Sequence, residues 1–300
     1  MLSAALELGR RAAWAALGAA CALGCGRPPP SQFPDARSAL DRLHATTACA
    51  RGVSAESKLD YIGSSGRIRA DVLYVTAAPD RVRFDVVSPF GAMLSTLATN
   101  GRNFTFSNLR ERQFIHGPAN ACNLARFTRV PLAPHALLDL LRGDAPVLVH
   151  RPEQASIAWK GSRYLIDIES TRGARQKLEL EPLPDDFERP WREQRVRVLG
   201  VSVEQLGVPL YAIELDDHAP VRTAPPRVDP DGLEPPIPPS GPECSVHLAR
   251  RIHIEVPSGD HDLVLALKSA VLNPPLVSAV FAPERPRGLR DLYSPCEQAW

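Results

Sequence analysis

Apolar and polar residues alternate along much of the chain after residue 49. Over residues 67–72 charged side chains alternate with apolar ones, and residues 81–87 repeat the pattern with Val82, Phe84 and Val86 against charged neighbours. A period of two predicts strands with one apolar and one charged face. Such strands form antiparallel sheets that are packed on one side and face water on the other.

The same alternation predicts further strands. They lie at residues 92–99, 103–108, 155–160, 163–169, 175–181, 195–203, 209–216, 252–256 and 262–272. The Asn100-Gly101 pair is a strong hairpin signal, which favours an antiparallel meander. If the sheet curls, the apolar faces of consecutive strands make one concave surface. Together with a leucine-rich helix, the residues expected to line it are Val72, Tyr74, Val82, Phe84, Val86, Met93, Leu97, Phe104, Phe106, Leu137 and Leu141.

Three segments predict short helices, at residues 34–45, 118–127 and 133–143. In the first, Leu40 and Leu43 share a face, and Asp35 lies near the start, where a negative charge is favourable. In the third, Pro134 fits the first turn and Gly143 fits the position after the last turn. The fold class is therefore mainly β with a few helices.

Residues 218–243 contain nine prolines. Proline lacks a backbone N–H, so this density disfavours both helix and strand. We expect an extended surface insertion within a single domain spanning residues 34–300. A plain loop and a recognition segment are both compatible with the composition.

An apolar residue occupies a predicted turn at residues 89–91. Phe90 lies between Pro89 and Gly91, where a polar residue is usual. Two interpretations are open. Phe90 folds back onto the sheet, or it projects and contacts a membrane or an acyl chain.

The formal net charge is +1, and the first 24 residues contribute that charge through Glu7, Arg10 and Arg11. The remainder is neutral, which excludes the basic footprint of a nucleic-acid-binding protein. Thirty prolines in 300 residues also argue against an all-helical fold.

Residues 1–24 have the pattern of an export signal. Arg10 and Arg11 precede an apolar stretch that is too short to span a bilayer. The signal ends in Ala-Leu-Gly-Cys, residues 22–25, which resembles the bacterial lipobox and implies a lipidated Cys25 followed by a tether over residues 25–33. Cys21 is a second candidate, and cleavage without lipidation a third. By this resemblance, Gly26 implies the outer membrane, with the domain facing the periplasm.

Export leaves four cysteines in an oxidising compartment, which indicates two disulfides. Three pairings are possible. We expect Cys49 to pair with Cys122 and Cys244 with Cys296, because each pair then lies within one section of the chain.

Catalytic and metal-binding patterns are weak in this sequence. Asp260, His261 and Asp262 are adjacent, but neighbouring strand residues point to opposite faces. The Ser-Gly-Asp sequence before an apolar strand is also typical of an ordinary turn. The sequence lacks a nucleophile-elbow motif, a phosphate-binding glycine loop and paired cysteine or histidine ligand spacing. We therefore expect neither an enzyme nor a metal or cofactor site.

The order of motifs resembles the LolB and LolA-like outer-membrane lipoproteins. The matching stretches are DRVRFDVVSPFG (80–91), STLATNGRNFTFSNLRERQFIHGPA (95–119), VPLAPHALLDLLRG (130–143) and SAVLNPPLVSAVFAPERPRG (269–288). The resemblance implies a strongly curved, incomplete antiparallel barrel lidded by helices. Its apolar inner face would hold acyl chains or lipidated proteins.

In LolB-type receptors a protruding apolar turn residue acts in delivery to the membrane, and Phe90 occupies the matching position. The resemblance thus implies a monomeric lipoprotein acceptor or acyl-chain carrier without covalent chemistry. The alternative is a non-transporting interaction or sensor lipoprotein with the same fold.

Overall fold

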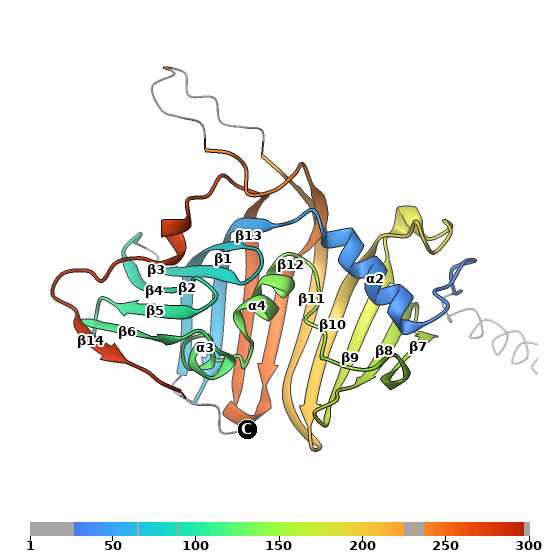
Figure 1. Ribbon diagram of the computed structural model, residues 1–300, viewed down its shortest axis with the longest axis horizontal. Helices are drawn as coiled ribbons and strands as arrows, with labels where there is room; N and C mark the ends of the chain where they lie inside the picture. The colour runs from blue at the N-terminus through green and yellow to red at the C-terminus, as the bar shows by residue number, and fades with distance from the viewer. Residues whose placement is uncertain (1–26, 65, 89, 225–230, 232–236, 297–300) are drawn as a thin grey trace, which may run out of the picture.

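The computed structural model describes residues 27–64, 66–88, 90–224, 231 and 237–296 (Figure 1). Within them one mixed sheet has the order β14-β6-β5-β4-β3-β2-β1-β13-β12-β11-β10-β9-β8-β7. The predicted signal segment and Cys25 lie outside the described residues. So does Pro89, beside Phe90.

The strands are numbered in chain order, and they range from 4 residues in β14 to 15 residues in β11. They are β1 (Gly52–Gly63), β2 (Gly66–Ala77), β3 (Arg81–Val87), β4 (Met93–Thr99), β5 (Asn103–Asn108), β6 (Gln113–Pro118), β7 (Ala155–Lys160), β8 (Arg163–Glu169), β9 (Ala174–Pro182), β10 (Val196–Gln205), β11 (Val208–Arg222), β12 (Ser245–Val256), β13 (His261–Leu272) and β14 (Arg290–Tyr293). Their pairings are antiparallel except that β14 lies parallel to β6. The predicted fold class, an open and strongly curved mainly β sheet with helices, is confirmed.

In the described part of the chain, three helices cover the concave face: α2 (Ala36–Thr47), α3 (Ala121–Thr128) and α4 (Pro134–Leu141). Figure 1 shows α2 crossing β8–β10, while α3 and α4 lie in front of the other half of the sheet. The side chains of Asp35 and Asn120 cap α2 and α3 by accepting backbone N–H bonds from Ser38 and Asn123. Each helix turns its apolar side inward, so the core lies between helices and sheet.

The pairing of β1 with β13 joins the two halves of the chain. Val53 lies opposite Leu272 and Tyr61 opposite Leu263, which brings together strands about 200 residues apart. This contact places the apolar faces of β12 and β13 beside those of β1–β5. Strands β1–β6 alone would form an open antiparallel meander. The joined sheet instead curves around one common hydrophobic core.

The expected disulfide pairing is wrong. Cys49 is bonded to Cys244, and Cys122 is bonded to Cys296, with sequence separations of 195 and 174 residues. The prediction assumed that cysteines close in sequence pair. In the folded chain, the β1–β13 pairing and the return of the C-terminal segment to β6 bring remote cysteines together instead.

The proline-rich segment is partly strand. β11 continues to Arg222 and therefore includes His218 to Arg222, with Pro220 opposite His247 on β12. Strand β10 pairs with β11 only as far as Glu214, so Pro220 has a ladder partner on one side alone. A proline is tolerated in such a one-sided stretch because the missing N–H faces no partner strand.

A buried carboxylate joins α2 to the end of α4. The side chain of Asp144 is fully buried and accepts hydrogen bonds from Thr47 Oγ1 (2.9 Å), Arg142 Nη2 (3.1 Å) and the backbone N–H of Ala145 (2.8 Å). His44 Nδ1 lies 3.0 Å from both carboxylate oxygens. Burial raises the pKa of Asp144, but the bond from His44 and the nearby positive charges outweigh it, so this pKa lies below the usual value.

The contribution of His44 to the stability of the protein should fall as pH rises above neutrality, whereas burial lowers the pKa of His218 and of His247, whose contributions change in the opposite direction. The hydrogen bond to Asp144 raises the pKa of His44 above 6.5, so its contribution is complete below the unfolded pKa and is lost as pH rises through the folded pKa. Urea unfolding at about pH 6 and about pH 8.5 measures this difference. The unfolding free energy by which wild type exceeds His44→Gln should be larger at about pH 6 than at about pH 8.5, and equal values at the two pH values would contradict the assignment.

Candidate functional site

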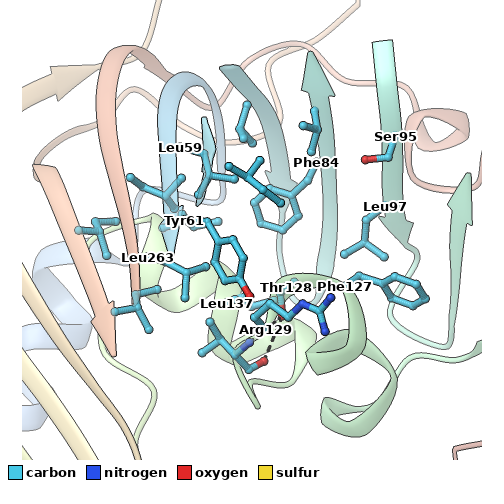
Figure 2. Close-up of a pocket in the computed structure, with 18 of the residues that line it drawn as sticks. Leu59, Tyr61, Phe84, Ser95, Leu97, Phe127, Thr128, Arg129, Leu137 and Leu263 are labelled. Carbon is cyan, nitrogen blue, oxygen red and sulfur yellow. Dashed lines mark hydrogen bonds between the residues drawn. The ribbon is translucent and has the colours of Figure 1, made fainter. Parts of the chain in front are cut away.

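An apolar cavity of about 310 Å³ lies between the concave face and helices α3 and α4 (Figure 2). Its lining residues come from β1–β5, the α3–α4 region and β12–β13. They are Leu59, Tyr61, Ile68, Val72, Phe84, Val86, Ser95, Leu97, Phe106, Phe127, Thr128, Arg129, Val130, Leu137, Leu140, Leu141, Ile252, Ile254, Leu263 and Leu265. Its volume falls at the lower end of the range of about 300–1,000 Å³ for small-molecule sites.

The strands position the lining by alternation. Val72 on β2, Phe84 on β3 and Leu97 on β4 point inward, while Arg83 and Asp85 on the outer face pair with each other at 2.8 Å. On β12, Ile252 and Ile254 line the cavity in the same way. The inward side chains are fixed by the sheet, so much of the cavity wall is preformed.

The structure brings most of the predicted cavity residues together. Val72, Phe84, Val86, Leu97, Phe106, Leu137 and Leu141 line the cavity. Tyr74, Val82 and Phe104 are buried in the core and are not part of the lining, with exposures of 4%, 2% and 0%. Met93 is 43% exposed, away from the cavity.

A bulge explains the position of Met93. Val86 lies opposite Ser95, but Val87 lies opposite Met93, so the register shifts by one residue between these two pairs. One extra residue in a strand turns the following side chains to the other face. The alternation that predicted an inward Met93 therefore ends at Ser95.

Several lining residues were not predicted. Leu59 and Tyr61 belong to β1, a strand outside the predicted ranges, while Phe127 lies at the end of α3 and Arg129 directly follows that helix. Ile252, Ile254, Leu263 and Leu265 lie on predicted strands with clear alternation. The alternation identified an apolar face on those strands, but only the β1–β13 pairing shows which cavity that face lines.

Helix α3 is held in place by the C-terminal segment. The buried side chain of Asn123 donates to the carbonyl oxygens of Pro118 (2.9 Å) and Ser294 (3.2 Å), and the Ser294 hydroxyl donates to Asn123 Oδ1 (2.7 Å). The bond between Cys122 and Cys296 adds a covalent tie at the same place. These contacts fix the first turn of α3, and its last turn supplies Phe127 to the cavity wall.

Polar groups at the cavity are few. The Tyr61 hydroxyl lies 3.2 Å from His261 Nδ1, and the Thr128 hydroxyl lies 3.0 Å from the carbonyl of Leu124. Ser95 and Arg129 are the other polar side chains in the lining. This arrangement suits the burial of an apolar ligand.

Phe90 projects from the β3–β4 turn with 97% of its surface exposed. The turn is closed by bonds from the Ser88 N–H to the Ala92 carbonyl (2.8 Å) and from the Gly91 N–H to the Ser88 carbonyl (2.9 Å). Gly91 has φ +81°, a conformation that glycine adopts without strain. Of the two interpretations, the structure has Phe90 projecting and not folded onto the sheet.

The residues 260–262 do not act together. Asp260 is a turn residue with φ 50°, His261 contacts Tyr61, and Asp262 Oδ2 lies 3.2 Å from His253 Nε2. The ligand atoms of His253, Glu255 and Asp262 lie within 4.8 Å of one another on the outer face. His253 Nε2 lies 3.2 Å from Asp262 and 3.8 Å from Glu255, so contacts among these side chains account for the cluster.

Comparisons with known proteins identify the fold and no particular protein. The sequence matches no protein-family model and no curated protein. The structure is similar to a DUF1329 family protein from Desulfovibrio piger, at 10% identity and a TM-score of 0.52, over 82% of this chain and 96% of that one. A similarity of this degree shows a shared fold.

Two further solved structures are similar at 10% identity. One is a putative outer membrane lipoprotein-sorting protein domain from Vibrio parahaemolyticus, with a TM-score of 0.49 over 82% of this chain and 94% of that one. The other is a LolA superfamily protein from Nitrosomonas europaea, with a TM-score of 0.47 over 83% and 98%. Within the described residues, no helix has the length and apolar character to cross a membrane.

Proposed function

We propose that this chain is a cell-envelope protein that binds an acyl chain in the cavity between its curved sheet and its helices. The observation that carries the proposal is the lining itself, in which sixteen of the twenty side chains are apolar and converge on one preformed space. An acyl chain suits such a lining, because its methylenes are apolar and form no hydrogen bonds.

The energetics favour binding by burial alone. Each methylene transferred from water contributes about 0.8 kcal/mol, so ten of them contribute about 8 kcal/mol before the costs of association. Sheet, disulfides and the anchored α3 hold the wall in place, which keeps the cost of ordering the site small. The remaining costs are subtracted from this sum of about 8 kcal/mol, so a micromolar dissociation constant requires the burial of more than about ten methylenes or a further contribution from the head group.

The envelope location and the lipid anchor extend the proposal. The export signal, the lipobox-like residues 22–25 and the two disulfides support an exported protein tethered by Cys25 to the outer membrane and facing the periplasm. Its occupant would be a free acyl lipid or the acyl chains of a lipidated protein. Receipt of lipoproteins is the narrower form of this function, and the LolB-like order of motifs supports it.

A fluorescent acyl probe tests the proposal. The protein lacking residues 1–24 should bind a probe such as a dansyl-labelled C11 fatty acid at one molecule per chain with a micromolar dissociation constant, because the cavity buries the chain. Fluorescence titration and displacement by unlabelled palmitate measure it. Failure to bind probe and palmitate would contradict acyl binding.

Phe90 should contribute to membrane contact. A phenylalanine held out by a tight turn can insert into a bilayer surface, and its burial is worth about 1.5–3 kcal/mol. Phe90→Glu should lower binding to phospholipid vesicles roughly tenfold or more in a sedimentation assay. Leu206, which is 88% exposed at another turn, offers the matched control Leu206→Glu. Equal loss in both variants would contradict a specific role for Phe90.

A further inference from the structure

Building on the proposed acyl-binding function, we propose that the occupant of the cavity carries an anionic group, which Arg129 binds at the edge of the cavity. The ligand class is then a free anionic amphiphile, such as a fatty acid or a lipid with an exposed phosphate. Two features of Arg129 lead to this inference, its place in the lining and its lack of an ionic partner, and its backbone conformation supplies the variant that tests it.

Arg129 is the single charged residue among those that line the cavity. It directly follows the last residue of α3, and Figure 2 shows it at the α3 end of the cavity, away from Leu59 and Phe84. The side chain is exposed, so its guanidinium stays hydrated while the neighbouring wall is apolar. An amphiphile placed with its chain among the strand residues would have its polar end here.

No ion pair of Arg129 occurs in the part of the chain that the structure describes. Other arginines of this region are engaged: Arg142 pairs with Asp139 at 2.8 Å and with Asp144 at 3.1 Å, and Arg126 donates to the Ser294 hydroxyl. The adjacent Thr128 hydroxyl is within bonding distance of the carbonyls of Leu124 and Val130. Arg129 is thus the group at this edge that is free to bind an anion.

The backbone of Arg129 is in a conformation that favours glycine. Its φ of 64° and ψ of 3° are left-handed, and its N–H bonds the Ala125 carbonyl at 2.9 Å to end α3. Glycine is the usual residue at this helix position because a Cβ is disfavoured there. Arg112 and other turn residues also have a positive φ, so this conformation does not itself mark a site, but it makes glycine a substitution that the backbone at position 129 accepts.

An arginine recognises a carboxylate or a phosphate through paired, charge-assisted hydrogen bonds. An acyl chain on an uncharged head would leave the guanidinium without such a partner. The cavity should therefore prefer palmitate or a lysophospholipid with an anionic head to palmitoylglycerol, although all three bury the same chain. Raised ionic strength should weaken the binding of the anionic ligands alone.

The test compares matched ligands on matched variants. Wild type, Arg129→Gly and Arg129→Lys are titrated with palmitate, lysophosphatidylglycerol and palmitoylglycerol by displacement of the fluorescent acyl probe. Arg112→Gly is the control, because Arg112 is also exposed with a positive φ of 53° but lies outside the cavity. Arg129→Gly should fold with a melting temperature at or above that of wild type, since glycine suits the backbone.

We expect Arg129→Gly to lower the affinity for the anionic ligands about tenfold and to leave palmitoylglycerol unchanged. Arg129→Lys should retain part of the preference, and Arg112→Gly should match wild type. The carboxylate and phosphate ligands show which anion is preferred. Equal wild-type affinity for charged and uncharged ligands, or equal losses for both in Arg129→Gly, would overturn this inference and leave the acyl-binding function standing. A wild type that binds none of the three would overturn the proposed function and this inference with it.

Discussion

Replacing Ser95 with tryptophan is expected to lower the affinity for an acyl chain roughly hundredfold while the protein stays folded. Ser95 lies on β4 with its side chain in the cavity lining, two residues from Leu97 and opposite Val86 on β3. An indole at this position would fill space that a ligand chain needs. Displacing four methylenes at about 0.8 kcal/mol each costs about 3 kcal/mol, which corresponds to a roughly hundredfold loss of affinity.

The control for this variant is Ser156→Trp. Ser156 is an exposed residue of β7 and does not line the cavity, so it adds the same indole on the outside of the same sheet. Circular dichroism and thermal unfolding establish that both variants fold, and the fluorescent acyl probe measures binding. Retained affinity in a folded Ser95→Trp variant would mean that the chain binds elsewhere.

Removing the bond between Cys49 and Cys244 is expected to cost about 3–5 kcal/mol of unfolding free energy. The bond closes a loop of 195 residues, so it restricts most of the unfolded chain. It also joins the segment before β1 to the start of β12, where Asn273 further bonds the carbonyl of Cys49 at 2.8 Å. The double variant Cys49→Ser/Cys244→Ser should therefore show a large drop in denaturant midpoint.

The pair Cys122→Ser/Cys296→Ser is the matched comparison, with a separation of 174 residues. Its loss should loosen the C-terminal segment and α3, detected as faster hydrogen exchange at residues 121–128, in addition to a lower stability. Non-reducing peptide mapping of the wild type identifies the bonds directly. A Cys49–Cys122 fragment would contradict the topology described above.

The local part of the fold could be predicted from the sequence. Alternation fixes which side of a strand is apolar, and a tight hairpin fixes the register between neighbours, so Phe84, Leu97 and Phe106 were expected on one surface and lie there. The Asn100-Gly101 turn joins β4 to β5 as its dipeptide indicates. Both signals depend on residues that are close together in the sequence, so the local pattern is enough to predict these features.

The non-local part could not be predicted in the same way. The pairing of Tyr61 with Leu263 depends on how two distant strands meet, and no local period encodes it. The disulfide error has the same origin, since Cys49 meets Cys244 only after β1 and β13 pair. Arg129 reaches the lining because it directly follows α3, and no hydrophobic pattern in the sequence marks that position.

The most direct measurement of the central claim is photo-crosslinking of the wild-type protein with a diazirine analogue of palmitate, followed by peptide mapping. If the acyl chain occupies the cavity, the adducts should map to lining residues of β4, β5 and β12–β13, such as Leu97, Phe106 and Ile254, and excess palmitate should suppress them. Adducts on the outward charged faces of these strands, or adducts that palmitate does not suppress, would contradict binding in the cavity.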